Sequence, residues 1–282
     1  MSTSTGDLGL VPVAGASTFA AWRRLRLRMI YWWRFGNVPA LDRPVRFTEW
    51  VQWRKLNGHS RAEAKLTDKL YAKTHAAARI GRDLAVPTLW SGTSLPRDPP
   101  AALPLIVKAN HGCNQYRVIR TAADWARARR RTTAWMKRTY GEWLDERAYR
   151  EARRLLLVEP FLGGEGSPLP VDYKVYVFGG IAALIQIHEA RETRRCWTQF
   201  DLSWNRVGGV ASSAAPPLGL NAMLKAAEAC ARGMDFLRVD FYEVDGRLWF
   251  GEYCLYPGSG LDPFLPDSLD FDLGRLWDAA RS

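Results

Sequence analysis

One stretch of the chain, residues 238–260 (RVDFYEVDGRLWFGEYCLYPGSG), most constrains what it can fold into. Two runs rich in aromatic and β-branched residues, 239–244 and 248–253, flank an Asp-Gly pair, which is a strong signal for a tight turn. The stretch therefore predicts a two-stranded antiparallel hairpin that leads into a loop rich in glycine and proline.

The length of the turn decides which side chains of this hairpin share a face. If the turn is the Asp-Gly pair alone, Asp240 pairs with Gly251 and lies on the opposite face from Glu252. If the turn takes one residue more, Asp240 pairs with Glu252, and Arg238 pairs with Cys254. The second register would suit a Mg²⁺ site beside an anion-binding arginine, whereas the first predicts an ordinary half-solvated sheet. The hairpin alone leaves both open.

Composition places the chain among globular proteins and favours anionic partners. Its 282 residues are 47% hydrophobic and 24% charged, and the net charge is +11. The four cysteines are widely spaced without a CxxC pair, which predicts neither a disulfide framework nor a zinc site and favours a reducing cytoplasm. No run approaches the ~18 apolar residues of a membrane-spanning helix.

The first part of the chain is expected to be helical. Residues 1–20 resemble a flexible tail, and 21–83 form a helical N-terminal region, with Thr48 capping one helix and a further helix over 62–78. Residues 20–36 (AAWRRLRLRMIYWWRFG) interleave arginines with large apolar side chains. Such a helix can lie on an anionic membrane surface, or it can pack against the protein with its arginines in water.

The pattern changes near residue 84, where short β-branched runs begin. Helices are expected among them over 122–140, with a solvated basic face, and over 221–233. Strands and helices do not alternate regularly, so the predicted class is α+β. We expect two subdomains here, 84–160 and 161–282.

Charged side chains stand at the ends and on the faces of the predicted strands. Lys108 ends a strand before a polar turn that contains His111, and Glu159 ends a buried strand. Period-two alternation puts Asp172 and Lys174 on one face of another strand. A lysine beside exposed backbone N–H groups can hold phosphates, and a buried glutamate is rare unless it is paired or functional. Each signal is weak alone, but they occur in a definite order along the chain.

That order of charged residues along the chain resembles the ATP-grasp superfamily. The sequences of the individual segments resemble its TupA-like (teichuronopeptide biosynthesis-like) branch. The resemblance covers nearly the whole chain. It rests on eight segments in sequence: FTEWVQWRKL (47–56), KLTDK (65–69), VKANHG (107–112), VEPFL (158–162), DYKVYVFGG (172–180), FDLSWN (200–205), LRVDFYEVDGRLWFGE (237–252) and PGSG (257–260).

The resemblance implies an ATP-grasp fold, in which two α+β subdomains grip ATP, preceded here by the helical N-terminal region. It also implies a set of nucleotide-binding residues. Lys108 would contact the α- and β-phosphates, and Asp172 the ribose. From its position in the loop, His111 is expected either to touch the nucleotide or the acceptor, or to fix the turn. The adenine would lie against Glu159 and the backbone of Pro160, Phe161 and Leu162.

The same resemblance assigns the remaining charged residues to catalysis and metal binding. Lys174 would face the phosphates or the acceptor, and Arg238 would steady the charged intermediate. Asp240 and Glu252 would ligate Mg²⁺. Cys254 departs from the family pattern, which usually has an asparagine ligand there, and a thiol is a poor ligand for Mg²⁺. The loop HGCNQY after Lys108 is also poorer in glycine than the family's phosphate-covering loop.

The implied reaction activates a carboxylate as an acyl phosphate and captures it with an amine, giving ADP, phosphate and an amide. We expect an anionic small-molecule or glycan substrate, such as an acidic sugar or amino acid in cell-surface polymer assembly, and no nucleic acid partner. Two alternatives stay open: phosphoryl transfer to a hydroxyl, and a catalytically weak nucleotide-binding scaffold in peripheral contact with an anionic membrane. The expected location is cytoplasmic, including the inner face of the membrane.

Overall fold

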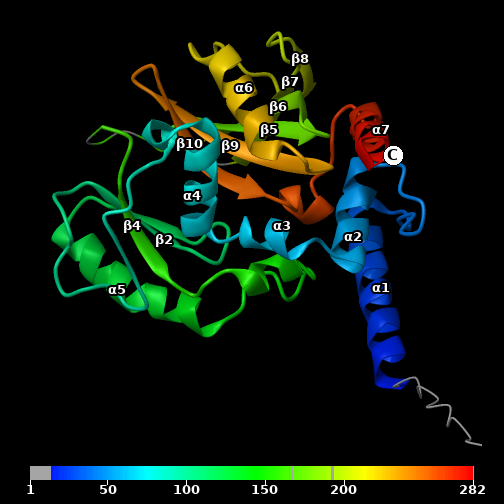
Figure 1. Cartoon of the computed structure of the whole chain (residues 1–282), viewed down its shortest axis with the longest axis horizontal. Helices are drawn as coiled ribbons and strands as arrows, with labels where there is room; N and C mark the ends of the chain where they lie inside the picture. Colours follow the sequence, from blue (N-terminus) through cyan, green and yellow to red (C-terminus); the bar gives the residue numbers. More distant parts are fainter. Residues whose placement is uncertain (1–13, 165, 167, 192–193, 282) are drawn as a thin grey trace, which may run out of the picture. The chain divides into compact units, whose positions relative to one another are not determined.

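A computed structural model describes residues 14–281 apart from 165, 167 and 192–193 (Figure 1). The chain divides into two compact units, 1–39 and 40–282, which are described separately. Residues 1–13 of the expected tail lie outside the described residues. In the first unit, helix α1 (Ala14–Phe35) includes the basic, aromatic segment singled out above.

Three short helices open the second unit: α2 (Phe47–Asn57), α3 (Arg61–Lys65) and α4 (Lys69–Ile80). The single helix expected over 62–78 is therefore wrong. The helix is interrupted there and a new one begins. The Asp68 carboxylate accepts a hydrogen bond from the backbone N–H of Tyr71, at 2.9 Å, and so caps this second helix.

The expectation that Thr48 caps α2 is also wrong. The helix begins two residues earlier, at Phe47 with Arg46 at the N-cap, and the Glu49 carboxylate accepts hydrogen bonds from the backbone N–H groups of Val45 (3.0 Å) and Arg46 (3.2 Å). The Thr48 hydroxyl instead donates to the buried Asp270 carboxylate at 2.7 Å. This threonine joins the N-terminal part of the unit to its last helix.

The first sheet has four antiparallel strands in the order β1-β4-β2-β3. Helix α5 (Ala122–Lys137) packs on β2 and β3 and buries Trp125 and Ala128 against the sheet. Two 3₁₀ turns flank this part of the chain, η1 (Arg82–Leu84) and η2 (Arg147–Glu151). The strands are β1 (Trp90–Gly92), β2 (Leu105–Ala109), β3 (Tyr116–Ile119) and β4 (Leu156–Pro160).

The second sheet has six antiparallel strands in the order β10-β9-β5-β6-β7-β8. Helix α6 (Leu220–Ala231) packs on β5, β6 and β9, while α7 (Ser268–Arg281) packs against α2 (Figure 1). The 3₁₀ turn η3 (Pro257–Gly260) follows the last strand. The strands are β5 (Asp172–Phe178), β6 (Ile181–Arg191), β7 (Arg194–Phe200), β8 (Arg206–Gly209), β9 (Phe236–Val244) and β10 (Arg247–Cys254).

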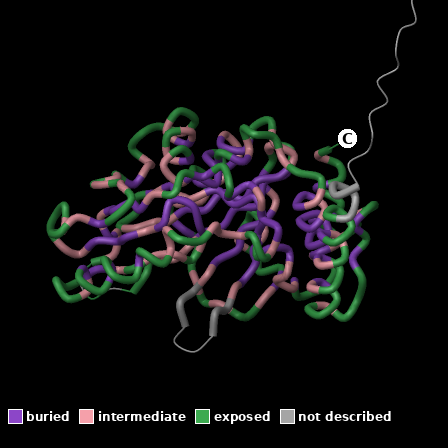
Figure 2. Tube along the Cα trace, turned by 90° about the horizontal axis from the view of Figure 1, so that it is seen from below, coloured by how far each residue is buried: buried purple, intermediate pink, exposed green. Residues whose placement is uncertain are grey.

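The core of the second unit gathers around the six-stranded sheet. Phe47 of α2 and Trp277 of α7 contact Phe178 and Phe236 on β5 and β9, with ring centroids 4.3–6.3 Å apart. Figure 2 shows the buried trace concentrated in the interior, with exposed residues on the outer loops and helices. The predicted α+β class is confirmed, and the helices expected over 122–140 and 221–233 are found as the slightly shorter α5 and α6.

Neither predicted register of the hairpin holds along its whole length. The turn is the two-residue Asp245-Gly246, whose positive φ values of 53° and 71° match a tight hairpin turn. The ladder then shifts at Gly251, between Phe250 and Glu252, so that Glu252 pairs with Asp240. A one-residue bulge therefore produces the shared face that was expected from a longer turn.

Candidate active site

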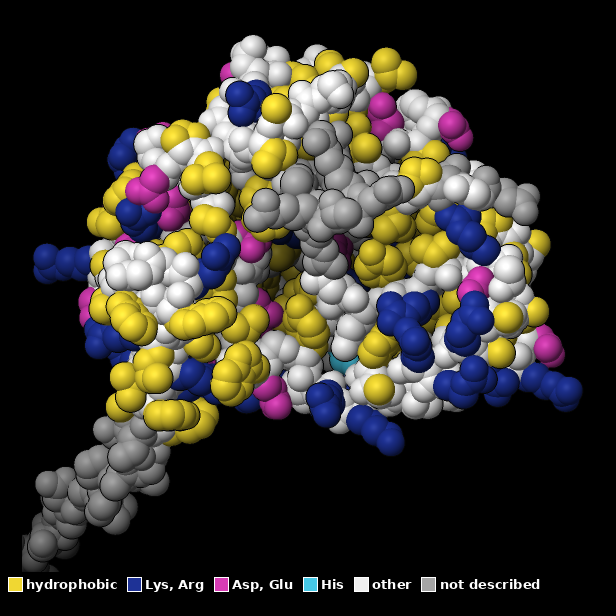
Figure 3. Space-filling model, turned by 180° about the vertical axis from the view of Figure 1, so that it is seen from behind, with side chains coloured by type: hydrophobic (Ala, Val, Ile, Leu, Met, Phe, Trp, Pro, Cys, Tyr) yellow, Lys and Arg dark blue, Asp and Glu magenta, His cyan; other side chains and the backbone are white. Residues whose placement is uncertain are grey.

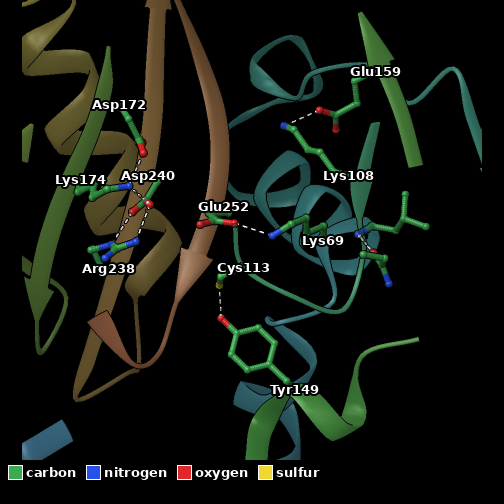
Figure 4. Close-up of polar contacts among 12 residues, drawn as sticks. Lys69, Lys108, Cys113, Tyr149, Glu159, Asp172, Lys174, Arg238, Asp240 and Glu252 are labelled. Atoms are coloured by element: carbon green, nitrogen blue, oxygen red, sulfur yellow. Dashed lines mark hydrogen bonds and ion pairs between the residues drawn. The ribbon is translucent and has the colours of Figure 1, made fainter. Parts of the chain in front are cut away.

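Four charged side chains of β5 and β9 form one cluster, which is buried apart from the partly exposed Asp172 (Figure 4). Lys174 and Asp240 are direct cross-strand partners, and the Lys174 Nζ lies 2.7 Å from Asp240 Oδ2. Lys174 also forms an ion pair with Asp172, two residues along β5. Arg238 donates to both oxygens of Asp240, from Nε and Nη2, each at 2.7 Å. Strand alternation on two neighbouring strands thus assembles the cluster.

The charges in this cluster stabilise one another. Burial alone would raise the pKa of the Asp240 carboxyl, but Arg238 and Lys174 outweigh it and lower this pKa to about 2. Burial would lower the pKa of Lys174, yet the two aspartates raise it above its ordinary value. For Asp172 burial dominates and its pKa is raised, although Lys174 opposes the shift. Asp240 is therefore held as a carboxylate between two cations.

Glu252 stands beside Asp240 and is held by a lysine from another element. The Lys69 Nζ, at the first residue of α4, lies 2.6 Å from Glu252 Oε2. Burial would raise the pKa of Glu252, but Lys69 lowers it overall, and the same pair raises the pKa of Lys69. Sequence reasoning did not single out Lys69, although it lies in the KLTDK segment used for the resemblance.

A second charged group lies on the four-stranded sheet. The buried Glu159 of β4 forms ion pairs with Lys108 of β2, whose Nζ lies 2.7 Å from Oε2, and with Lys73 of α4. Burial would raise the pKa of Glu159, but the two lysines lower it. Sequence reasoning missed Lys73. It follows Lys69 by four residues on α4, so helical spacing puts both lysines on one face, toward the two groups of carboxylates.

The segment after Glu159 and the loop after Lys108 are held by hydrogen bonds to neighbouring parts of the chain. The Phe161 N–H donates to the Pro104 carbonyl at 3.2 Å, and proline has no N–H, so among residues 160–162 the Leu162 N–H is the remaining backbone donor. In the loop, Asn110 accepts from the Leu70 N–H at 2.9 Å and donates to the Arg153 carbonyl at 2.8 Å. The Asn110 side chain thus anchors this loop to α4 and to the chain before β4.

His111 is buried and contacts helix α5. It is 2% exposed, and its Nε2 lies 3.0 Å from the Trp135 carbonyl oxygen. Two residues on, the Cys113 Sγ lies 2.6 Å from the Tyr149 hydroxyl (Figure 4).

The residues that could hold a metal ion are Asp240 and Glu252. No group of three His, Cys, Asp or Glu side chains with metal-binding proximity occurs among the described residues. Cross-strand pairing puts the two carboxylates side by side, which fits part of the oxygen shell of Mg²⁺, with phosphate oxygens and water supplying the rest. Burial raises the pKa of the Cys254 thiol to about 11, so it stays protonated at neutral pH and adds no thiolate.

The loop PGSG, now η3, is anchored from α2. Lys55, 2% exposed, donates from Nζ to the Ser259 carbonyl at 2.8 Å and to its hydroxyl at 2.7 Å, while Gln52 donates to the Ser259 and Gly260 carbonyls at 2.9 and 3.0 Å. Gly258 and Ser259 both have positive φ. Sequence reasoning missed the role of Lys55, which a single buried lysine in a tryptophan-rich helix does not reveal.

The chain belongs to the ATP-grasp class, and within it to the TupA-like ATP-grasp family, whose model matches residues 49–277. The expected ATP-grasp fold is thereby confirmed. No curated protein sequence matches the chain.

Two solved structures illustrate its distant similarity to ligases. The D-alanine–D-alanine ligase from Bacillus anthracis, in complex with ATP, is 15% identical, with a TM-score of 0.47 over 76% of this chain and 63% of that chain. An L-amino acid ligase from Bacillus licheniformis is 13% identical, with a TM-score of 0.48 over 77% of this chain and 50% of that one. The chain thus spans less than two thirds of the length of either protein.

Proposed function

We propose that this protein is an ATP-dependent carboxylate–amine ligase that forms an amide through an acyl phosphate, on an acidic sugar, glycan or amino acid. Membership of the TupA-like ATP-grasp family supports the class of reaction. The observation that carries the proposal is the pairing of Asp240 with Glu252 beside Arg238 and Lys174. In this proposal the two carboxylates hold a metal ion, and the two cations beside them clamp an anion.

The proposed reaction has two steps. A carboxylate oxygen of the acid substrate attacks the γ-phosphorus of ATP, and the bond from that phosphorus to the bridging oxygen of ADP breaks. The amine nitrogen then attacks the carbonyl carbon of the acyl phosphate, phosphate leaves, and the nitrogen loses a proton. The products are ADP, phosphate and an amide.

In this scheme the protein mainly positions charged groups and neutralises their charge. Lys108 and Lys69 turn from Glu159 and Glu252 to the phosphate oxygens, while Arg238 and Lys174 face the transferred group. Asp172 is placed to accept from the ribose, and its Oδ1 is buried without a hydrogen-bond partner among the described residues. Mg²⁺ held by Asp240 and Glu252 would supply charge neutralisation at the phosphates.

Calorimetric titration of Mg²⁺-ATP tests the nucleotide site before any substrate is known. We expect binding by the wild type and by Lys137→Ala, a control lysine exposed on α5, and its loss in Lys108→Ala. Equal binding by the two variants would remove Lys108 from the phosphate site.

Once a substrate is known, analysis of the products separates the two candidate reactions. ADP accompanied by free phosphate supports ligation, whereas ADP without free phosphate supports transfer to a hydroxyl.

A second candidate function, attachment to an anionic membrane surface, is favoured by the exposed face of α1. Large apolar side chains at helical spacing are half to four-fifths exposed there: Phe19 55%, Trp22 55%, Leu25 50%, Met29 57%, Trp32 57% and Trp33 82%. Figure 3 shows such side chains, in yellow, on the part of the chain that follows the grey N-terminal trace. Helix α1 also carries five arginines and no acidic residue. Tryptophan and arginine together suit the headgroup region of anionic lipids.

Vesicle flotation tests this attachment. None of the described helices has the length and apolar character needed to cross a bilayer. Because the arginines of α1 would be attracted to anionic headgroups, binding is expected to weaken as the salt concentration rises. Trp32→Ser with Trp33→Ser should lose about tenfold or more of the binding to phosphatidylglycerol vesicles. Trp143→Ser, which changes an exposed tryptophan of the second unit, should bind like the wild type. If the wild-type protein does not float with these vesicles, the proposed attachment is refuted.

A further inference from the structure

A pocket that the scheme above does not use opens between the loop after Lys108, the end of α5 and the turn η2. Its volume is about 370 Å³, within the range of small-molecule sites. None of the residues proposed to hold the nucleotide phosphates or Mg²⁺ lines it, so a ligand bound here would lie outside those sites. Its wall includes His111, Thr139, Glu142, Tyr149, Arg150 and Arg154.

Two guanidinium groups make the pocket wall suitable for an anion. The ion pair between Arg150 and Glu142 is loose, with Nη2 and Oε1 3.6 Å apart, and Arg154 donates to the hydroxyl of Thr139. Because a guanidinium carries five N–H donors, both arginines keep donors for a ligand beyond these contacts. Two positive charges and one negative charge on the wall favour a ligand with negatively charged oxygens.

His111 adds a hydrogen-bond acceptor to the same wall. The carbonyl of Trp135 can only accept, so the His111 Nε2, 3.0 Å away, donates to it. In the neutral ring Nδ1 is then an acceptor, and it is buried without a partner among the described residues. A ligand that donates to this nitrogen recovers the cost of leaving it unpaired. The pocket therefore fits a ligand that has an O–H donor as well as negatively charged oxygens.

A hydrogen phosphate group meets both requirements. Its negatively charged oxygens match the guanidinium groups, and its O–H can donate to the His111 Nδ1. An ionised carboxylate has oxygens that only accept, and so does sulfate, so neither of them satisfies the histidine. The pair of arginines alone would accept any of these anions, whereas the arginines and the histidine together favour hydrogen phosphate.

The pocket is next to the candidate active site but is not part of it. The Tyr149 hydroxyl lies 2.6 Å from the Cys113 Sγ, and Figure 4 shows Cys113 between Tyr149 and the Lys69–Glu252 pair. Burial and the charge of Glu252 raise the pKa of the Cys113 thiol, while Lys69 opposes the shift. A test of the pocket must therefore separate its ligand from the phosphates of the nucleotide.

We propose that this pocket binds a hydrogen phosphate group, either free phosphate or the phosphate of a monoester, at a site separate from the nucleotide. Arg150 and Arg154 hold its oxygens, and the His111 Nδ1 accepts from its O–H. The binding requires no turnover and leaves the acid and amine of the proposed reaction unengaged. It therefore holds or fails separately from the proposed ligase function.

Calorimetry and phosphorus NMR on the full chain at neutral pH test the pocket. The probes are inorganic phosphate, D-galactose 1-phosphate and sulfate, each titrated with and without saturating Mg²⁺ and the non-hydrolysable ATP analogue AMP-PNP. The pocket variant is Arg150→Gln with Arg154→Gln, and both residues are exposed, so the fold should be retained. The matched control is Arg129→Gln with Arg130→Gln, which removes the same charge from the exposed face of α5.

We expect phosphate or its monoester to bind the wild type and the control alike, and the pocket variant about tenfold or more weakly. The tighter of the two probes identifies the source of the phosphate group. Sulfate should bind the wild type about fivefold or more weakly than phosphate, because it leaves the His111 Nδ1 unpaired. Saturation with the nucleotide analogue should leave phosphate bound.

Three results would overturn the proposal: neither phosphate probe binds, the pocket variant binds them as well as the wild type, or the nucleotide analogue displaces them. Equal affinity for sulfate would overturn the assignment of hydrogen phosphate as the ligand. If the wild type binds phosphate through the two arginines but does not bind the nucleotide analogue, the pocket is supported and it is the proposed ligase function that fails.

Discussion

Asp240 and Glu252 lie side by side on the sheet but differ in how far they are exposed. The side chain of Asp240 is 1% exposed and is held by two cations, while that of Glu252 is 26% exposed and is held by Lys69. Removing one partner of a buried ion pair leaves an uncompensated charge and typically costs about 3–5 kcal/mol. The two carboxylates should therefore respond differently to neutralisation.

Glu252→Gln is the sharper test of the metal assignment. We expect it to lose Mg²⁺-ATP binding with little change in the free energy of unfolding, because its ion pair with Lys69 is partly exposed. Asp240→Asn should lose binding and also about 3 kcal/mol of stability. Urea unfolding without nucleotide, followed by calorimetry, separates the two effects. Wild-type affinity in Glu252→Gln would remove this residue from the metal site.

Asp235 gives a pH-dependent prediction at a structural ion pair. It forms an ion pair with the buried Arg54 and accepts from Trp277 Nε1 and Arg281 Nη1, each at 3.0 Å. Burial would raise the pKa of Asp235, but Arg54 and the hydrogen bonds lower it below the ordinary 3.8. Its stabilisation is therefore complete above pH 3.8 and is lost as pH falls through the lower, folded-state pKa.

Asp235→Asn should reduce the free energy of unfolding by about 3 kcal/mol at neutral pH, and the difference from the wild type should shrink below pH 4. Chemical unfolding at several pH values measures both. The control, Asp272→Asn, removes an exposed carboxylate that pairs with Arg275 on the surface, and should change little. A pH-independent deficit at Asp235 would show that its charge is not what stabilises the fold.

At the scale of elements, the bulge in β10 decides whether the site forms. A Cβ added to Gly251 would lie 3.0 Å from the Asp240 carbonyl oxygen and 3.1 Å from Tyr242 Cε2. Gly251→Val should therefore displace β9 and cost about 1–3 kcal/mol. It should also weaken Mg²⁺-ATP binding, because Asp240 moves with its strand.

Gly219→Ala is the control for this change, since its Cβ would meet only the Glu243 carboxylate oxygen, at 3.2 Å. Unfolding and nucleotide titration of both variants measure the effect. Wild-type affinity in Gly251→Val would mean that the bulge is not needed to place Asp240.

Sequence patterns predicted helices, strands and turns better than they predicted which side chains interact across the fold. The Asp-Gly turn, the alternation that joins Asp172 to Lys174, and the helices α5 and α6 all depend on local preferences, and the structure confirms them. The bulge could not be read from the sequence because the crowding at Gly251 comes from β9, a neighbouring strand, and not from the local sequence. Lys69 and Lys73 were missed because a lysine acquires its role only when a fold brings a distant carboxylate to it.

At the scale of the whole second unit, each sheet supplies part of the candidate site. The four-stranded sheet carries Lys108 and Glu159, the six-stranded sheet carries Asp240 and Glu252, and α4 contributes a lysine to each group. Figure 4 shows the two groups facing a common region, with Lys69 between them. A nucleotide bound there would contact both sheets. Its binding should therefore stabilise both sheets against unfolding.

Amide hydrogen exchange with and without Mg²⁺-ATP tests this connection. At a ligand concentration about 100 times Kd, a ligand that binds only the folded state adds about 2.7 kcal/mol to its stability. We therefore expect slower exchange in β2 and β4 as well as in β9 and β10, and none of this slowing in Lys108→Ala. Protection confined to the six-stranded sheet would mean that the nucleotide does not engage Lys108 and Glu159, and that the two sheets do not grip it together.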